Sequence, residues 1–199
     1  MRLSKTLLST GLAVLFAAPL AAAEAAQAPP PADQWWQGLS QHCGRAYVGW
    51  LASDDAADAI FAERRLVMHV RACAERRIEI PFHVGEDRSR TWVLTRTAEG
   101  IQLEHDHRHE DGSADEITMY GGHTAGPGTA AIQSFPADER SRALFRAHDI
   151  PQSADNVWTM ELVPGESFSY LLRRPARYLR IDFDLSQPVD PPPPPWGHE

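Results

Sequence analysis

Residues 101–112 read IQLEHDHRHEDG, and this stretch shows most clearly which fold the sequence predicts. Apolar and polar residues alternate at its start, which is typical of a β-strand with one buried and one solvated face. Side chains two residues apart lie on the same side of a strand. The side chains on one side here are Ile101, Leu103, His105, His107 and His109. The pattern therefore predicts a strand that carries three imidazoles on the face of its apolar residues.

The same alternation recurs in other parts of the chain. It is clearest in residues 66–72, 78–84, 158–162 and 179–185. Short turn signals such as Asp111-Gly112 and Pro164-Gly165 separate consecutive segments, and short connections between sequential strands indicate an antiparallel meander. We expect about eight or nine strands, enough for a small barrel or a sandwich. The sequence predicts an all-β fold with minor helix and favours a calycin-like barrel, because closure leaves no exposed sheet edge.

Helix is expected in three short segments. They are Asp33–Gln41, with Asp33 as the N-terminal cap, Ser53–Ala62 and Ala137–Ala147. Residues 121–128 hold four glycines and a proline and are expected to form a loop. No strand–glycine loop–helix pattern surrounds this loop, so it does not indicate a phosphate site.

The first 23 residues have the pattern of a secretory signal peptide. Arg2 and Lys5 precede an apolar run from Leu7 to Leu20, and small residues follow as far as Ala23. The run is shorter than the about 20 apolar residues of a spanning helix. We therefore expect an exported, soluble mature chain, periplasmic or extracellular, without a membrane span.

The rest of the chain divides into three parts by composition. Residues 24–32 are rich in proline and alanine and are expected to be a flexible linker, and residues 33–187 are expected to form a single antiparallel β domain. Residues 188–199 contain the run Pro191–Pro195, which favours a polyproline II segment without internal hydrogen bonds. This composition predicts a disordered tail.

The chain is acidic and contains a single lysine. Its formal net charge is −8, and removal of Arg2 and Lys5 with the signal peptide makes it −10. An acidic chain without a basic stripe argues against nucleic acid as a partner. Lys5 is the only lysine, so the mature chain lacks the amine that Schiff-base chemistry or a serine–lysine dyad requires.

The two cysteines, Cys43 and Cys73, both lie in the exported part. An oxidising compartment favours a disulfide between them, and the Cys-x-x-Cys spacing typical of redox sites is absent. Closing the loop from Cys43 to Cys73 would stabilise the fold by about 3–4 kcal/mol on the chain-entropy model.

The three clustered histidines are candidate metal ligands, because neutral imidazole is the commonest metal ligand in proteins. Four residues of strand separate His105 from His109 by nearly 14 Å, at about 3.4 Å per residue. A zinc ion, with Zn–N bonds of about 2.0–2.1 Å, does not reach all of His105, His107 and His109 on a flat strand. Two of them with a ligand from a neighbouring strand would suit zinc or another transition metal.

The length of the turn after the histidines decides which side chains face them. With a two- or four-residue loop these are Glu116, Thr118 and Tyr120, which would form a polar ligand-binding site. With a three-residue loop the corresponding side chains are Asp115, Ile117 and Met119, which are mostly apolar.

Three functions are consistent with this pattern. The leading hypothesis is a binding module for a transition metal or a small polar molecule at the histidine strand. The first alternative is a metal-assisted hydrolase with Glu110 or Glu116 as base, and the sequence leaves open whether the protein is an enzyme. The second is a structural envelope protein without a ligand, in which Arg108 pairs with a neighbouring acid such as Asp106 and no pocket lies behind the histidines.

Three strings resemble sequences in a group of small exported bacterial proteins that has no known activity. They are Leu103 to Gly112, Tyr120-Gly121-Gly122 and Asn156-Val157-Trp158. The resemblance covers most of residues 40–190. It implies export and supplies neither a function nor a catalytic residue.

Overall fold

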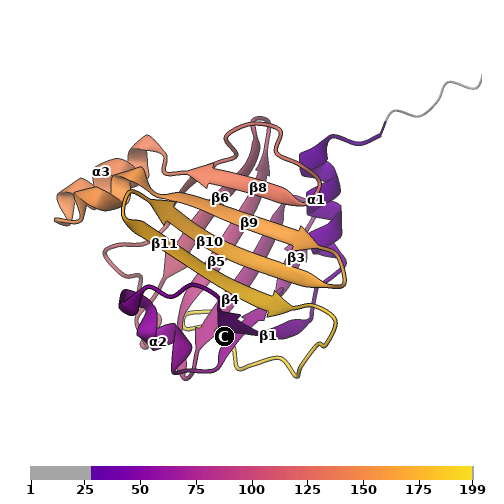
Figure 1. The fold of residues 1–199 in the computed structure, drawn as a ribbon, viewed down its shortest axis with the longest axis horizontal. Helices are drawn as coiled ribbons and strands as arrows, with labels where there is room; N and C mark the ends of the chain where they lie inside the picture. The colour runs from indigo at the N-terminus through magenta and orange to yellow at the C-terminus, as the bar shows by residue number, and fades with distance from the viewer. Residues whose placement is uncertain (1–27, 199) are drawn as a thin grey trace, which may run out of the picture.

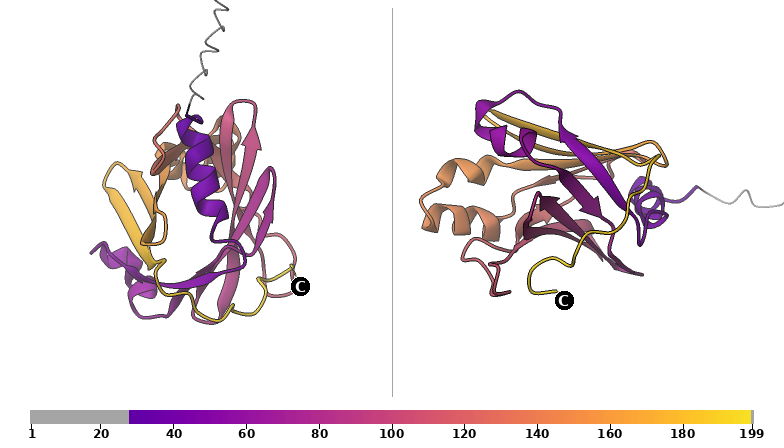
Figure 2. Two further views of the ribbon diagram at one scale, coloured as in Figure 1. Left: turned by 90° about the vertical axis from the view of Figure 1, so that its right-hand side faces the viewer. Right: turned by 90° about the horizontal axis from the view of Figure 1, so that it is seen from below.

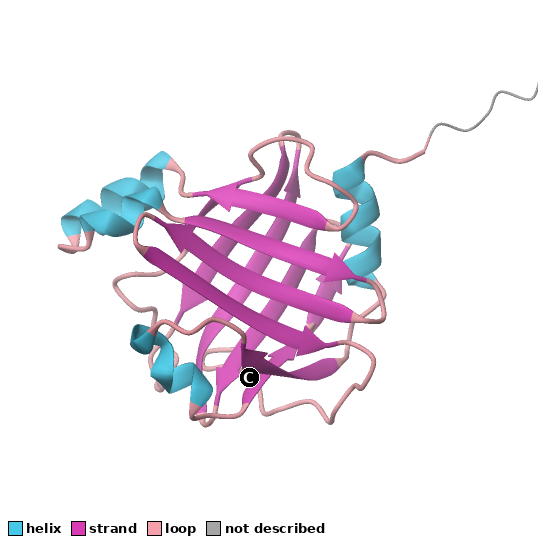
Figure 3. Ribbon diagram, viewed as in Figure 1, coloured by secondary structure: helices cyan, strands magenta, loops and turns pink. Residues whose placement is uncertain are grey.

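Eleven antiparallel strands form one sheet that curls until it is nearly closed into a barrel (Figures 1 and 3). The computed structural model describes residues 28–198, so the predicted signal peptide lies outside the described residues. The strands follow the order β7-β6-β5-β4-β2-β1-β11-β10-β9-β8, and β3 pairs with β4. The predicted all-β, barrel-like fold with minor helix is therefore confirmed.

The strand bounds show why the expected number, eight or nine, is too low. The strands are β1 (Ala46–Leu51), β2 (Leu66–His69), β3 (Ala72–Ala74), β4 (Arg77–Val84), β5 (Asp87–Thr97), β6 (Gly100–His107), β7 (Tyr120–His123), β8 (Ile132–Pro136), β9 (Val157–Val163), β10 (Ser167–Arg174) and β11 (Arg177–Asp184). The alternating segment over residues 66–72 is divided between two strands, β2 and β3, of 4 and 3 residues, and β8 is only 5 residues long.

Helices cover both ends of the barrel (Figure 2). They are α1 (Pro31–Ser40), α2 (Ala59–Ala62) and α3 (Glu139–Ala147), with 3-10 turns η1 (Ala56–Asp58) and η2 (Pro151–Asp155). Helix α1 lies across one end and buries Trp35 and Leu39, whereas α2 and α3 lie at the opposite end. Helix α1 begins at Pro31, inside the expected linker, and Asp33 does not cap it. The Asp33 carboxylate pairs instead with Arg96 of β5.

The edge strands β7 and β8 approach each other where the sheet nearly closes. Gly121 and Gly122 belong to β7, so the expected loop over residues 121–128 is wrong at its start. A Cβ atom on Gly122 would lie 1.9 Å from the carbonyl oxygen of Pro136, and one on Gly121 would lie 1.8 Å from that of Leu103. Glycine is required here because backbones meet closely, and not because the chain turns.

The disulfide between Cys43 and Cys73 is confirmed. It connects the turn after α1 to β3, and the two Cα atoms are 6.1 Å apart, a usual separation for such a bond. Within residues 28–198, no helix has the length and apolar character needed to cross a membrane.

Residues 188–198, here named the C-terminal strap, differ from the expected disordered tail. The strap runs along the outside of the barrel (Figure 2), where the Val189 amide donates to the Ala46 carbonyl at 2.8 Å. Near its end, His198 Nε2 lies 2.8 Å from Asp106 Oδ2. A polyproline II segment has no internal hydrogen bonds, so its carbonyls are free to accept from the barrel, as Pro194 does from Arg88 at 2.9 Å. Composition alone does not reveal these distant partners.

Candidate functional site

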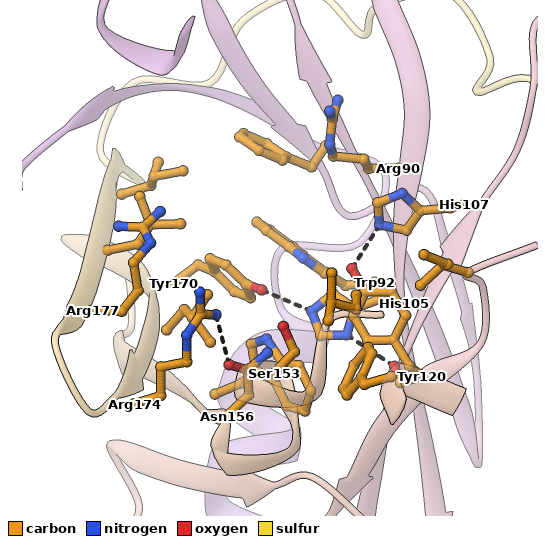
Figure 4. Close-up of a pocket in the computed structure, with 18 of the residues that line it drawn as sticks. Arg90, Trp92, His105, His107, Tyr120, Ser153, Asn156, Tyr170, Arg174 and Arg177 are labelled. Carbon is orange, nitrogen blue, oxygen red and sulfur yellow. Dashed lines mark hydrogen bonds between the residues drawn. The ribbon is translucent and has the colours of Figure 1, made fainter. Parts of the chain in front are cut away.

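A cavity of about 280 Å³ lies inside the barrel at the end near α2 and α3 (Figure 4). Strands β4, β5, β6, β7, β9, β10 and β11 contribute its walls, and Phe61 of α2 and Phe145 of α3 also line it. The structural envelope hypothesis, which predicts no pocket behind the histidines, does not account for this cavity.

Two groups of aromatic rings form most of the cavity wall. In the first, the Trp92 ring stacks between Phe82 and Tyr170, with centroid distances of 5.0 and 4.5 Å. In the second, the His105 ring stacks on Tyr120 at 4.8 Å and lies 4.9 Å from Trp158. The rings of both groups project inward from their strands, so the wall is largely apolar.

His105 is buried in this wall, with 4% of its surface exposed. Its Nδ1 lies 3.1 Å from the carbonyl oxygen of Tyr120, and its Nε2 lies 2.8 Å from the hydroxyl of Tyr170. A carbonyl only accepts, so Nδ1 carries the proton and Nε2 accepts from Tyr170. Burial, reinforced by the nearby His107, lowers the pKa of His105 to about 3. This imidazole is neutral at ordinary pH.

His107 also points into the cavity, closer to its open end. Its Nε2 lies 3.0 Å from the Tyr120 hydroxyl. Burial, and then the positive charge of Arg90, lower the pKa of His107 to about 4. Two of the three predicted histidines therefore belong to one site, each paired with a tyrosine.

His109 does not share this site, and the prediction of three imidazoles on one face is wrong for it. Strand β6 ends at His107, and His109 is exposed in the following turn, where its amide donates to the Ser113 carbonyl at 2.9 Å. The parity rule fails because it holds only while the strand continues.

The expected partner strand at 116–120 is also wrong, because β7 begins only at Tyr120. Tyr120 pairs directly with His105, so this residue does face the histidines as predicted. Glu116 is exposed, and the Thr118 hydroxyl accepts from the His107 amide at 2.7 Å and contacts Asp106 at 3.3 Å on the outer side of β6. Of the three predicted ligand-binding residues, only Tyr120 lines the cavity.

Among residues 28–198, no group of three or more His, Cys, Asp and Glu side chains is arranged to hold a metal ion. Glu110 and Glu116, the bases of the hydrolase hypothesis, are exposed and do not line the cavity. Asp106 faces outward and binds Arg108 at 3.0 Å, which is the pair that the structural envelope hypothesis expects.

Charge is distributed unevenly around the cavity. Three arginines line it, Arg90, Arg174 and Arg177, and no aspartate or glutamate does. Arg90 pairs with Asp87 at 2.5 Å, and Arg177 pairs with Asp58 and, at 3.1 Å, with Asp55. These carboxylates stand behind the arginines rather than in the cavity lining. The cavity of this acidic chain therefore has a positive lining.

Arg174 differs from the other two arginines because it forms no ion pair within residues 28–198. Its guanidinium donates to Asn156 Oδ1 at 3.0 Å (Figure 4). Burial, and then the neighbouring charge of Arg177, lower the pKa of Arg174. With Oδ1 turned to Arg174, the Asn156 amide nitrogen makes no hydrogen bond in the described part of the chain. Ser153, from η2, lines the cavity beside it.

Arg174, Tyr170 and Arg90 were not predicted as site residues, although their parity on the strands indicates that they face inward. Tyr170 and Arg174 have the parity of the buried Phe168, and Arg90 has the parity of the buried Trp92. Asn156 and Ser153 come from a 3-10 turn and the residue that follows it, where no periodic signal is available. Comparisons with protein-family models, with curated proteins and with solved structures found no match for this chain.

Proposed function

We propose that this protein is a binding module that encloses a small polar molecule in the end of its barrel. The observation that supports the proposal is a cavity of about 280 Å³ whose aromatic wall carries His105, His107, Tyr120 and Tyr170. Ligand cavities of proteins are mostly apolar, contain a few placed polar groups and measure about 300–1,000 Å³. The size of this one suits a ligand of one or two rings.

The cavity is well prepared for binding because its polar groups are already held in place. His105 is fixed between the Tyr120 carbonyl and the Tyr170 hydroxyl, and His107 is fixed by the Tyr120 hydroxyl. Side chains that are ordered before a ligand arrives lose little conformational entropy on binding. The apolar rings then supply most of the affinity, and the polar groups supply orientation.

The test is calorimetric titration of the mature protein with 2-naphthol, a two-ring probe with one hydroxyl. Leu172 lines the cavity, so the substitution Leu172→Trp fills the space that the probe needs. We expect 2-naphthol to bind the wild-type protein at one site, and Leu172→Trp to abolish binding while the circular dichroism spectrum is unchanged. Arg173→Trp, one position along β10 and exposed, is the matched control and should still bind. Binding that survives Leu172→Trp would place the ligand elsewhere and refute the proposal.

A further inference from the structure

We infer that the natural ligand of the cavity is an anion with an apolar body, and that its negative group is bound by Arg174. The inference rests on the proposed function and adds the chemical class of the ligand. It also assigns a binding role to Arg174, Asn156 and Ser153, three residues that lie away from the histidine strand.

The lining of the cavity contains basic side chains and no acidic ones. A molecule in the cavity contacts three arginines and no carboxylate, although acids outnumber basic residues in the chain by 27 to 19. The two cavity histidines are held neutral and add no charge of their own. Arg90 and Arg177 are paired with carboxylates behind the lining, so Arg174 is the lining arginine whose charge no carboxylate compensates within residues 28–198, and that charge favours an anion over a cation.

Arg174 has one neutral hydrogen-bond partner, Asn156, beside its guanidinium. A partly buried guanidinium without a carboxylate is unfavourable, because its lost hydration is only partly replaced by the single bond to Asn156 Oδ1. The neighbouring Arg177 makes the charged form of Arg174 still less favourable, because both guanidinium groups are positive. A carboxylate or phosphate on the ligand would supply the missing partner, and guanidinium groups bind both with paired hydrogen bonds.

Asn156 and Ser153 line the cavity together with Arg174 and add neutral hydrogen-bond donors. The bond from Arg174 fixes the Asn156 side chain with its carbonyl oxygen toward the guanidinium, so that its amide nitrogen is left as a donor. The Ser153 hydroxyl lines the same part of the cavity, and Figure 4 shows the three side chains gathered below Tyr170. An oxyanion is bound by several hydrogen-bond donors that lie close together, and here they are a guanidinium, an amide and a hydroxyl.

The wall that β4 and β5 contribute carries the Phe82 and Trp92 rings, which are suited to an apolar body. Neither ring carries a charge that would pair with a second ionic group. The class of ligand that matches both ends is a small monoanion with a ring or a short branched chain, such as an aryl carboxylate. Carboxylate and phosphate heads share the chemistry that Arg174 recognises, and titration distinguishes them.

The experiment compares three probes that share one naphthyl body by calorimetry: 2-naphthoate, 2-naphthyl phosphate and the neutral 2-naphthamide. We expect 2-naphthoate to bind about tenfold or more tightly than 2-naphthamide, because a charge-assisted bond replaces a neutral one. Arg174→Gln should remove this preference, weakening 2-naphthoate by about the same factor and leaving 2-naphthamide unchanged. Arg173→Gln, the exposed neighbour, should retain the preference. If 2-naphthyl phosphate exceeds 2-naphthoate, the head group is a phosphate.

The outcomes separate the two proposals. If 2-naphthamide binds as tightly as both anions, or if Arg174→Gln weakens all probes equally, the cavity binds ligands but the anion inference is refuted. If no probe binds the wild-type protein, 2-naphthol included, the proposed function itself fails. A preference for 2-naphthoate that persists in Arg174→Gln would show that another arginine binds the anion and would overturn the role of Arg174.

Discussion

Lowering the pH from 7 to 5 should destabilise this protein through its buried histidines. Burial lowers the pKa of His105 to about 3, and that of His107 and His83 to about 4. In the unfolded chain each of these groups has a pKa of about 6.5. Because the folded pKa is the lower one, the unfolded state binds protons first as the pH falls. The stabilisation that comes from these lowered pKa values is present above pH 6.5 and is lost progressively as the pH falls to about 3–4.

The decrease in the free energy of unfolding at pH 5 depends little on the pKa values of the histidines in the folded protein. All three imidazoles are still mostly neutral in the folded protein at that pH, so each contributes RT ln(1 + 10^1.5), or about 2 kcal/mol. Carboxylates change little between pH 7 and 5, since their unfolded pKa values are about 4. Three histidines together lower the free energy of unfolding by up to about 6 kcal/mol, which is a large part of the total for a domain.

The assay is urea denaturation of the wild-type protein and of His105→Gln at pH 7 and pH 5. Glutamine does not titrate and keeps one donor and one acceptor for the Tyr120 carbonyl and the Tyr170 hydroxyl. The free energy of unfolding should fall by about 2 kcal/mol less in His105→Gln than in the wild-type protein. The exposed His109 provides the control, and His109→Gln should behave like wild type. Equal losses in His105→Gln and wild type would refute the burial argument.

Three further predictions concern the scaffold. Deletion of residues 188–198 should lower the free energy of unfolding by about 2–4 kcal/mol, since it removes several hydrogen bonds to the barrel; an unchanged melting temperature would contradict this. Gly122→Ala should cost more than about 3 kcal/mol because its Cβ atom has no room, whereas Gly165→Asn, at an open turn, should cost less than about 1 kcal/mol in the same denaturation assay. Replacing Cys43 and Cys73 together by serine should cost about 3–4 kcal/mol, and a loss below about 1 kcal/mol would show that the bond does not restrain the unfolded chain.

The barrel was predictable because buried and more exposed residues alternate along several of its longer strands, such as β6, β9 and β11. Strand β6 shows both the strength and the limit of that signal. Its parity correctly predicts that His105 and His107 lie on the face of Leu103, but it does not reveal that the strand ends at His107. Strand ends depend on which neighbouring backbone is available for pairing, and that neighbour is distant in the sequence.

The group of Arg174, Ser153 and Asn156 in the cavity lining was less predictable than the barrel, for a different reason. An arginine at the end of a strand is usually solvated, so the parity that Arg174 shares with the buried Phe168 does not by itself show that it borders a cavity. Only the curvature of the sheet and the position of η2 bring Ser153 and Asn156 beside it. The position of the cavity thus follows from tertiary packing, whereas the residues on its walls follow from parity.

The pairing of β1 with β11 and the docking of the strap determine when folding can be completed. The Arg71 side chain donates to the His198 carbonyl across 127 residues of sequence, and Arg177 pairs with Asp58 across 119. Contacts so distant in the chain form slowly, because a long loop must close before they contribute any stability. A growing chain that has not reached β11 carries β1 as an unpaired edge, open to pairing with other chains. During synthesis, the chain therefore has to remain unfolded, or be protected from pairing with other chains, until β11 has been made.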